Sequence, residues 1–286
     1  MPPSSERQSG AGVATASYCA FRIQHGPVTL VSGTAGYAGG MEPPRPFYAL
    51  GQHFAVDLPG ARAVFSTRRG GCSSGSYESL NLGWLTDDDP RAVDLNRTTL
   101  QADIGAPPLS FVHQVHGAEV RRITANSPLA PAERPRVDGQ ATNLAGVAPT
   151  ALVADCLPIA VAGDGAVAMV HAGWRGLAAG VIAAGVTAVR QLGAQGPLSA
   201  AIGPGAGPCC YEVGGEVHAA FADVPEAHRG ANVDLKAIAR RQLERAGVGV
   251  VADIGICTIC SDLGLLFSHR RDRGVTGRQA GVAWLI

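Results

Sequence analysis

Three short apolar runs, separated by polar and turn-forming residues, constrain the fold of this chain more than any other feature. The runs are Thr150–Ala154, Ile159–Ala162 and Val167–His171, and they are interrupted by Asp155, Pro158 and the turn Gly163-Asp164-Gly165. Runs of this length that end at turn residues are typical of buried β-strands. We therefore expect adjacent buried strands here, two of them joined as a hairpin.

Helical patterns follow these strands. Apolar residues from Leu177 to Leu192 recur at helical intervals, and Gly193 can end the helix. Asp234 can cap a second helix that extends through Leu243, and Val250–Cys257 has the pattern of a further strand. Hairpins mixed with strand-to-helix connections favour a single α+β layered domain, with a mixed β-sheet and flanking helices, over a strictly alternating doubly wound fold.

The first forty residues differ from the rest of the chain. They are mostly small and polar, and regular apolar patterning begins near Met41. Their longest apolar stretch is broken by Gly, Ser and Thr, which is not the pattern of a signal peptide. We expect residues 1–40 to be a disordered extension, or upstream sequence translated from a start codon placed too early, and residues 41–286 to be the catalytic domain.

Charge and cysteine content restrict the function classes. The chain has 23 basic and 23 acidic residues, so no bulk electrostatic attraction favours a nucleic-acid or anionic-membrane partner. Seven cysteines are an odd number in a chain of 286 residues, which is large enough to fold without disulfides. We therefore expect a protein of the reducing cytoplasm.

Potential ligands and nucleophiles lie at the ends of apolar runs, beside Gly or Pro. The segments are HQVHG at 113–117, ADCLP at 154–158 and HAGWRG at 171–176. One cysteine and two histidines form a ligand set suited to Zn²⁺, with a fourth position open for water. His113 and His116 would face opposite sides of a strand, but the same side of a helix.

Two other cysteine chemistries fit the same sequence. Cys156 and His171 could form a thiolate–imidazolium dyad, because a cysteine nucleophile needs a neighbouring base. Cys257 and Cys260 form a C-x-x-C pair, which is a weak indication of a metal site unless Cys209 and Cys210 supply the second pair.

Several motifs together resemble the YfiH family, also described as the multicopper polyphenol oxidase (laccase) domain and as a peptidoglycan editing factor. Besides the three segments above they are STRRGG at 66–71, SLNLG at 79–83, AIGP at 201–204, GPCCYEVG at 207–214, FSHRRD at 267–272 and TGRQA at 276–280. The resemblance implies a fold similar to that of the cytotoxic necrotizing factor deamidases.

The resemblance also implies a cytoplasmic, zinc-dependent purine nucleoside phosphorylase. Its substrates would be phosphate and adenosine, inosine, guanosine or methylthioadenosine, and it would also deaminate adenosine. The family's metal ligands correspond to His116, Cys156 and His171. The Cys156–His171 dyad of a thiol hydrolase and the editing of peptidoglycan precursors are alternatives. Polyphenol oxidation is the least favoured, since the chain has eight histidines and no His-x-His pair, although copper could occupy the zinc site in vitro.

Each half of this chemistry requires particular residues. Deamination needs a proton shuttle, for which Asp155 and Glu212 are candidates, although Asp155 could instead orient a ligand or form a turn. Phosphorolysis needs donors that hold an anion, a task suited to arginine. The candidates are Arg68, Arg175, Arg270 and a backbone N–H cradle near residues 203–207. Asn81 could orient the base or sugar, or form an Asx turn.

Overall fold

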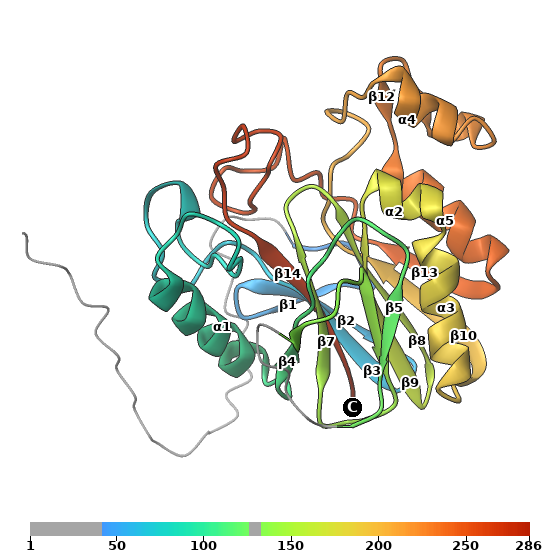
Figure 1. Ribbon diagram of the computed structural model, residues 1–286, viewed down its shortest axis with the longest axis horizontal. Coiled ribbons are helices and arrows are strands. Elements are labelled where there is room, and N and C mark those ends of the chain that lie inside the picture. The colour runs from blue at the N-terminus through green and yellow to red at the C-terminus, as the bar shows by residue number, and fades with distance from the viewer. Residues whose placement is uncertain (1–41, 126–132) are drawn as a thin grey trace, which may run out of the picture. The chain divides into compact units, whose positions relative to one another are not determined.

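Two mixed β-sheets packed face to face form the centre of the computed structural model, which describes residues 42–125 and 133–286 (Figure 1). The extension expected at residues 1–40 lies outside these described residues. Strands β3 and β14 of one sheet pack against β8 and β9 of the other. A core that includes Phe54, Phe65 and Met169 fills the space between the sheets.

The first sheet has the strand order β1-β2-β3-β14-β7-β4, with only β4 and β7 parallel. Its strands are β1 (Tyr48–Leu50), β2 (His53–Leu58), β3 (Ala61–Phe65), β4 (Leu109–Ser110), β7 (Ala148–Val153) and β14 (Gln279–Leu285). The strand β14 therefore lies in the middle of the sheet, between strands that come much earlier in the sequence.

The second sheet has the order β13-β10-β8-β9-β6-β5. Its strands are β5 (Val120–Ile123), β6 (Gly139–Thr142), β8 (Leu157–Asp164), β9 (Ala166–Ala172), β10 (Gln195–Ile202) and β13 (Val248–Asp253). The pairs β10–β13 and β5–β6 are parallel, and the others are antiparallel. A small separate ribbon pairs β11 (His228–Arg229) with β12 (Asn232–Val233).

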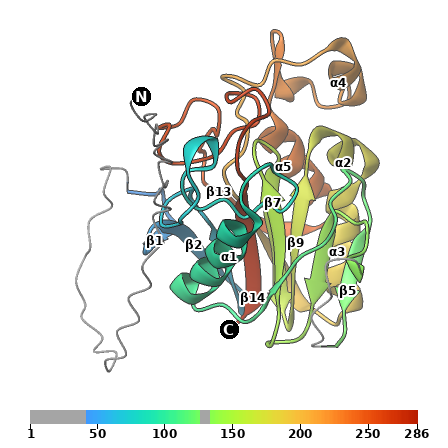
Figure 2. The same ribbon diagram turned by 60° about the vertical axis from the view of Figure 1, so that its left-hand side comes forward.

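Helices cover the outer faces of both sheets, which gives four layers in the order helix, sheet, sheet, helix (Figure 2). Helix α1 (Pro90–Ile104) packs Leu100 and Ile104 on the first sheet. Helices α3 (Val181–Gln191) and α5 (Leu235–Arg245) pack on the second sheet. The remaining helical segments are α2 (Trp174–Ala179), α4 (Gly215–Ala220), η1 (Gly75–Tyr77) and η3 (Pro225–Ala227).

The expected α+β layered fold is confirmed, and its layers contain two sheets. The three apolar runs form β7, β8 and β9, and β8 and β9 are the expected hairpin. Asp234 caps α5 as expected, because its side chain accepts hydrogen bonds from the N–H groups of Lys236 and Ala237.

Two sequence-based boundaries were wrong. The helix expected from Leu177 to Leu192 is divided into α2 and α3 by Gly180, which has a φ of 89°. Glycine adopts this left-handed conformation without the steric cost that a Cβ imposes, so it can end one helix and begin the next. The strand expected to extend to Cys257 ends at Asp253, and the following residues form a loop.

None of the helices in the described part of the chain is both long enough and apolar enough to cross a membrane.

A buried histidine provides a test of this packing. His53, which is 1% exposed at the start of β2, accepts a hydrogen bond from the Thr67 N–H. Its Nε2 is buried without a hydrogen-bond partner among the described residues. Burial lowers the pKa of His53 to about 4. In the unfolded chain the same histidine is protonated below about pH 6.5, so between these values it is neutral only in the folded protein.

We expect His53 to make the free energy of unfolding fall with pH between pH 6.5 and 4, by about 3 kcal/mol. His53→Asn keeps an acceptor for Thr67 but does not titrate. Urea unfolding at pH 7 and pH 4 should therefore show that this variant loses about 3 kcal/mol less than the wild type. His269→Asn, at an exposed position, is the control. Parallel pH dependences for the wild type and His53→Asn would contradict the assignment.

Candidate functional site

Two histidines and one cysteine from three separate segments meet at one end of the second sheet. Cys156 directly precedes β8 and His171 lies in β9, and the pairing of Pro158 with His171 places both at the same end of the hairpin. His116 comes from the loop before β5. The ligand atoms of the three residues lie within 4.8 Å of one another. The Cys156 Sγ is 3.8 Å from His116 Nε2.

A buried carboxylate, Asp138, holds two of these three residues in place. It lies just before β6 and is 1% exposed. Its oxygens accept hydrogen bonds from the N–H groups of Val115, His116 and Gly117, at 2.6 to 3.2 Å. Its Oδ1 also lies 2.9 Å from Nδ1 of His171. The same carboxylate therefore fixes the backbone that carries His116 and the ring of His171.

The HQVHG segment is a loop, neither the strand nor the helix considered from its spacing. Gln114 anchors it to β7 through two hydrogen bonds with the backbone of Leu152. His116 has a φ of 61°, a conformation that is uncommon for residues other than glycine. His116 joins the cluster with Cys156, whereas His113 lines the cavity described below.

Glycines in the HAGWRG segment leave the space that the cluster occupies. A Cβ on Gly173 would lie 2.9 Å from the Cys156 Sγ and 3.1 Å from the His116 ring. A Cβ on Gly176 would lie 2.9 Å from the carbonyl oxygen of Gly117. Any side chain at either position would therefore push α2 away from the cluster.

The charges of the cluster favour a thiolate. Burial alone would raise the pKa of the Cys156 thiol, but the charge of His171 and a hydrogen bond with His116 outweigh burial and lower it. Burial would lower the pKa of His171, and the Cys156 thiolate and Asp138 raise it instead. Burial also opposes ionisation of Asp138, yet its hydrogen bonds with His171 and the backbone keep its pKa below the usual value.

The donor set and its spacing fit a Zn²⁺ ion. Zinc bound tetrahedrally at 2.3 Å from sulfur and about 2.05 Å from nitrogen brings these ligand atoms to about 3.6 Å from each other. The observed distance from Cys156 to His116 is 3.8 Å. The His171 Nδ1 contacts Asp138, which leaves Nε2 for a metal, in the arrangement common for histidine ligands. Three protein ligands leave the fourth position open.

A cavity of about 600 Å³ opens above the cluster, and His116, Cys156 and His171 form part of its wall. Four aromatic and five arginine side chains also line it: Trp84, Phe111, Trp174, Tyr211, Arg97, Arg134, Arg175, Arg270 and Arg278. Arg97 and Arg134 lie over the Trp84 ring, and Arg270 lies over Tyr211. The cavity thus combines flat apolar surfaces with donors for anions.

Two of the three arginines predicted from the sequence reach this cavity. Arg175 and Arg270 line it, and Arg270 also donates a hydrogen bond to the carbonyl of Glu212. Arg68 does not line the cavity. Its guanidinium donates to the carbonyls of Glu78 and Leu263 and lies over the Phe267 ring, so it joins loops instead.

Three lining arginines escaped the sequence analysis. Arg278 belongs to TGRQA, so a signal was available. Arg97, on α1, and Arg134, on a loop, lie outside every motif. Their contribution depends on tertiary packing.

Asn81 is completely buried and does not line the cavity. Its Oδ1 accepts hydrogen bonds from the N–H groups of Gly83 and Arg278, and its amide donates to Thr86 and Asp88. The bond to Gly83 is the Asx turn considered from the sequence. Asn81 therefore acts on the cavity indirectly, because it holds the backbone of two lining residues.

The candidate proton shuttles are differently placed. Asp155 lies at the cavity wall with a φ of 88°, and its carboxylate accepts hydrogen bonds from Thr258, Ser268 and the N–H of Arg270. This network favours the orienting role over proton transfer. Glu212 is exposed and does not line the cavity, whereas the preceding residue, Tyr211, does.

The glycine-rich backbone at residues 203–207 does not form the expected anion cradle. The N–H groups of Gly203, Gly205 and Ala206 donate to carbonyls within the protein, and that of Gly207 donates to the Cys257 Sγ. These donors are therefore already used.

The fold of this chain is similar to those of solved YfiH and YlmD structures. The crystal structure of YfiH from Bacillus licheniformis matches 85% of this chain and 100% of its own, with a TM-score of 0.77 and 29% identity. That of YlmD from Geobacillus stearothermophilus matches 79% and 92%, with a TM-score of 0.72 and 36% identity.

The chain belongs to the family described as multi-copper polyphenol oxidoreductase laccase, whose model matches residues 62–286. Its curated relatives, however, are named purine nucleoside phosphorylases rather than laccases. A protein of Xylella fastidiosa strain Temecula1, named purine nucleoside phosphorylase, is 40% identical over 246 residues, which are 79% of this chain and 93% of its own. Purine nucleoside phosphorylase YfiH of Escherichia coli is 36% identical over 241 residues, 79% and 95% of the two chains.

The role of Asp138 can be tested through metal retention. In Asp138→Asn, an amide NH₂ replaces one of the oxygens that accept backbone N–H groups, so the His116 loop and the His171 ring lose their common anchor. We expect zinc affinity to fall roughly 10- to 100-fold, the usual effect of removing such a partner. Competition with a chromophoric chelator measures this affinity, and Asp262→Asn, at an exposed position, is the control. Unchanged zinc affinity in Asp138→Asn would refute this role.

Proposed function

We propose that the protein is a zinc-dependent purine nucleoside phosphorylase that also deaminates adenosine. Its substrates would be phosphate and adenosine, inosine, guanosine or methylthioadenosine. The observation that carries the proposal is the three-ligand cluster in the wall of a cavity lined by five arginines and four aromatic rings. The names of the relatives support the same activity.

His116, Cys156 and His171 would hold the metal. When bound there, Zn²⁺ supplies a Lewis acid whose open position can lower the pKa of water towards 7. The same site could bind Cu²⁺ in vitro, because copper competes strongly for nitrogen and sulfur ligands. Asp138 would keep both histidines oriented, and Asp155 would hold the loop of Arg270 against the cavity.

The arginines would bind phosphate. In phosphorolysis a phosphate oxygen bonds to the ribose C1′ while the bond from C1′ to the purine nitrogen breaks, so the phosphate must be held beside the sugar. Among the described residues, the Arg175 guanidinium makes no hydrogen bond or ion pair, and its donors remain available. Burial lowers the pKa of Arg278, and the nearby charges of the Cys156 thiolate and Asp155 only partly oppose this shift.

The aromatic residues would bind the purine. Their flat faces suit a planar base, and stacking favours such contacts. Burial, together with the charge of Cys156, raises the pKa of Tyr211 to about 12. Tyr211 therefore keeps its hydroxyl proton at neutral pH and can donate a hydrogen bond to the base or sugar.

The activity would belong to the domain predicted for residues 41–286, acting in the cytoplasm. No disulfide joins any of the six cysteines that the structure describes, as expected for a protein of a reducing compartment.

The proposal is tested by incubating the metal-loaded protein with adenosine, with and without phosphate. Adenine that forms only with phosphate indicates phosphorolysis, and inosine indicates deamination. We expect both products from the wild type and neither from Cys156→Ala, which also loses zinc. Absence of both products with the wild type would contradict the proposal and favour the editing of a peptidoglycan precursor.

Phosphate binding distinguishes the arginines. We expect Arg175→Ala to raise the KM for phosphate roughly ten- to a hundred-fold, because one charge-assisted contact is lost. Adenosine deamination should decline much less, since it needs no phosphate. Arg68→Ala is the matched control, because its guanidinium joins loops outside the cavity. Equal losses of both activities in Arg175→Ala, with zinc retained, would mean that Arg175 binds the nucleoside or stabilises the site.

A thiol hydrolase is the second candidate, because Cys156, His171 and Asp138 follow the order of a nucleophile, base and orienting carboxylate. Such a triad needs one imidazole, whereas here His116 also contacts the thiolate. A zinc-bound thiolate resists iodoacetamide until a chelator is added. Rapid labelling of Cys156 in the metal-loaded protein, with loss of activity, would favour the hydrolase.

A further inference from the structure

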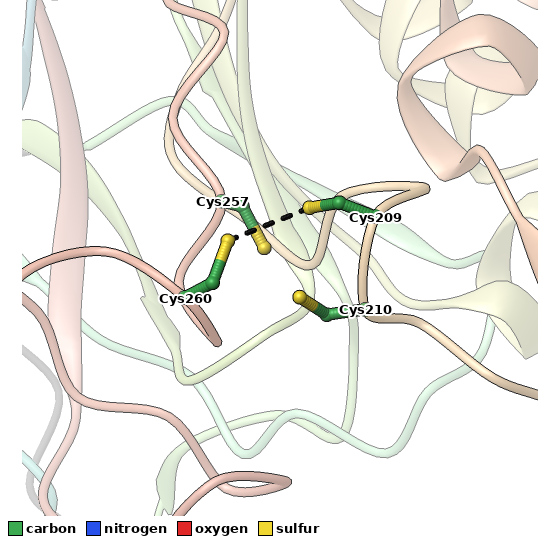
Figure 3. Close-up of side chains that lie close together, drawn as sticks. All are labelled: Cys209, Cys210, Cys257 and Cys260. Atoms are coloured by element: carbon green, nitrogen blue, oxygen red, sulfur yellow. Dashed lines mark hydrogen bonds between the residues drawn. The ribbon is translucent and has the colours of Figure 1, made fainter.

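Four cysteines that take no part in the cavity meet on two neighbouring loops (Figure 3). Cys209 and Cys210 lie in the turn that follows β10, and Cys257 and Cys260 lie in the turn that follows β13. Their four Sγ atoms lie within 4.8 Å of one another, and those of Cys209 and Cys260 are 3.5 Å apart. The C-x-x-C pair therefore has the second pair that the sequence left uncertain.

The sheet brings these loops together. Strands β10 and β13 are parallel neighbours, so their carboxyl ends lie at the same edge. The pairing continues beyond the strands, because the N–H of Gly205 donates to the Ile256 carbonyl and the N–H of Thr258 donates to the Gly205 carbonyl. Each loop is thus held in register up to its cysteines.

The backbone around the sulfurs is suited to negative charge. The N–H of Gly207 donates a hydrogen bond to the Cys257 Sγ at 3.2 Å, and such donors stabilise a thiolate. A Cβ on Gly207 would lie 3.0 Å from the Cys257 Cβ and 3.4 Å from the Cys209 Sγ. Glycine therefore permits the close approach of this backbone to both pairs.

We propose that Cys209, Cys210, Cys257 and Cys260 bind a structural Zn²⁺ ion, distinct from the metal centre in the cavity. Four sulfurs placed tetrahedrally at 2.3 Å from zinc lie about 3.8 Å apart. This spacing lies between the 3.5 Å that separates Cys209 and Cys260 and the 4.8 Å within which all four sulfurs lie. Soft thiolate ligands select zinc over the harder divalent cations. Zinc would displace the thiol protons to solvent, with no change of oxidation state.

The two metal sites differ in what they can do. Three ligands at the cavity leave a position for a reactant, whereas four cysteines close the coordination sphere, as in structural sites. The second ion would instead fix loops that reach the cavity. Cys210 precedes the cavity residue Tyr211, and Thr258, between the other two cysteines, donates a hydrogen bond to Asp155.

Zinc content tests the assignment. We expect the double variant Cys257→Ser/Cys260→Ser to contain about one zinc ion less per chain than the wild type, as measured by plasma mass spectrometry on anaerobically purified full-length protein. Cys72→Ser, a cysteine outside both clusters, is the matched control and should lose none. The test measures only the difference in zinc content between the double variant and the control. It is therefore valid whether or not the cavity has the proposed activity. Equal zinc content in the double variant and the control would overturn the proposal.

A second test uses the wild-type protein, so its outcome does not depend on whether the double variant folds. The anaerobically purified protein is treated with iodoacetamide before and after a chelator, and the labelled peptides are mapped. We expect all four cysteines to be protected before chelation and labelled together afterwards. Labelling of the four before chelation, or a disulfide between Cys209 and Cys260 in the untreated protein, would overturn the proposal.

Discussion

The carboxylate of Asp138 is the interaction on which the candidate site depends. It binds three successive N–H groups of the His116 loop and the ring of His171. Its own backbone also participates, because its N–H donates to Glu119 and its carbonyl accepts from the N–H of His171. A buried carboxylate without partners would be costly, but four donors offset that cost and turn the charge into a fixed anchor.

The positions of the other site residues are set by one end of the second sheet, where β8 begins and β9 ends. The β8–β9 hairpin brings Cys156 beside His171, and the glycines at 173 and 176 let α2 approach them. The two imidazoles then stabilise the negative charge of the Cys156 thiolate, so no lysine is needed for that purpose. The positive charge that we propose binds phosphate is carried separately, by arginines on loops and helices around the cavity.

Sequence alone predicted the parts of this arrangement that depend on local pattern. Apolar runs predicted β7, β8 and β9, and residue type with the family resemblance pointed to His116, Cys156 and His171. Asp138 was missed because a single Asp before Gly looks like a turn, and its role arises only when β6 and β9 are aligned. Arg68 was among the candidates because arginine in a motif suggests anion binding, but its guanidinium joins loops outside the cavity.

The central position of β14 has a consequence for how the protein is made. Ala280, in this strand, donates a hydrogen bond to Ser66, which lies 214 residues earlier, and β14 joins β3 to β7 in the first sheet. Contacts between such distant segments form slowly, because the entropy lost on closing a large loop opposes folding before the contacts can stabilise the chain. The two halves of that sheet must therefore remain unjoined on the ribosome until residues 279–285 are synthesised, and a nascent chain exposes two strand edges that chaperones can shield.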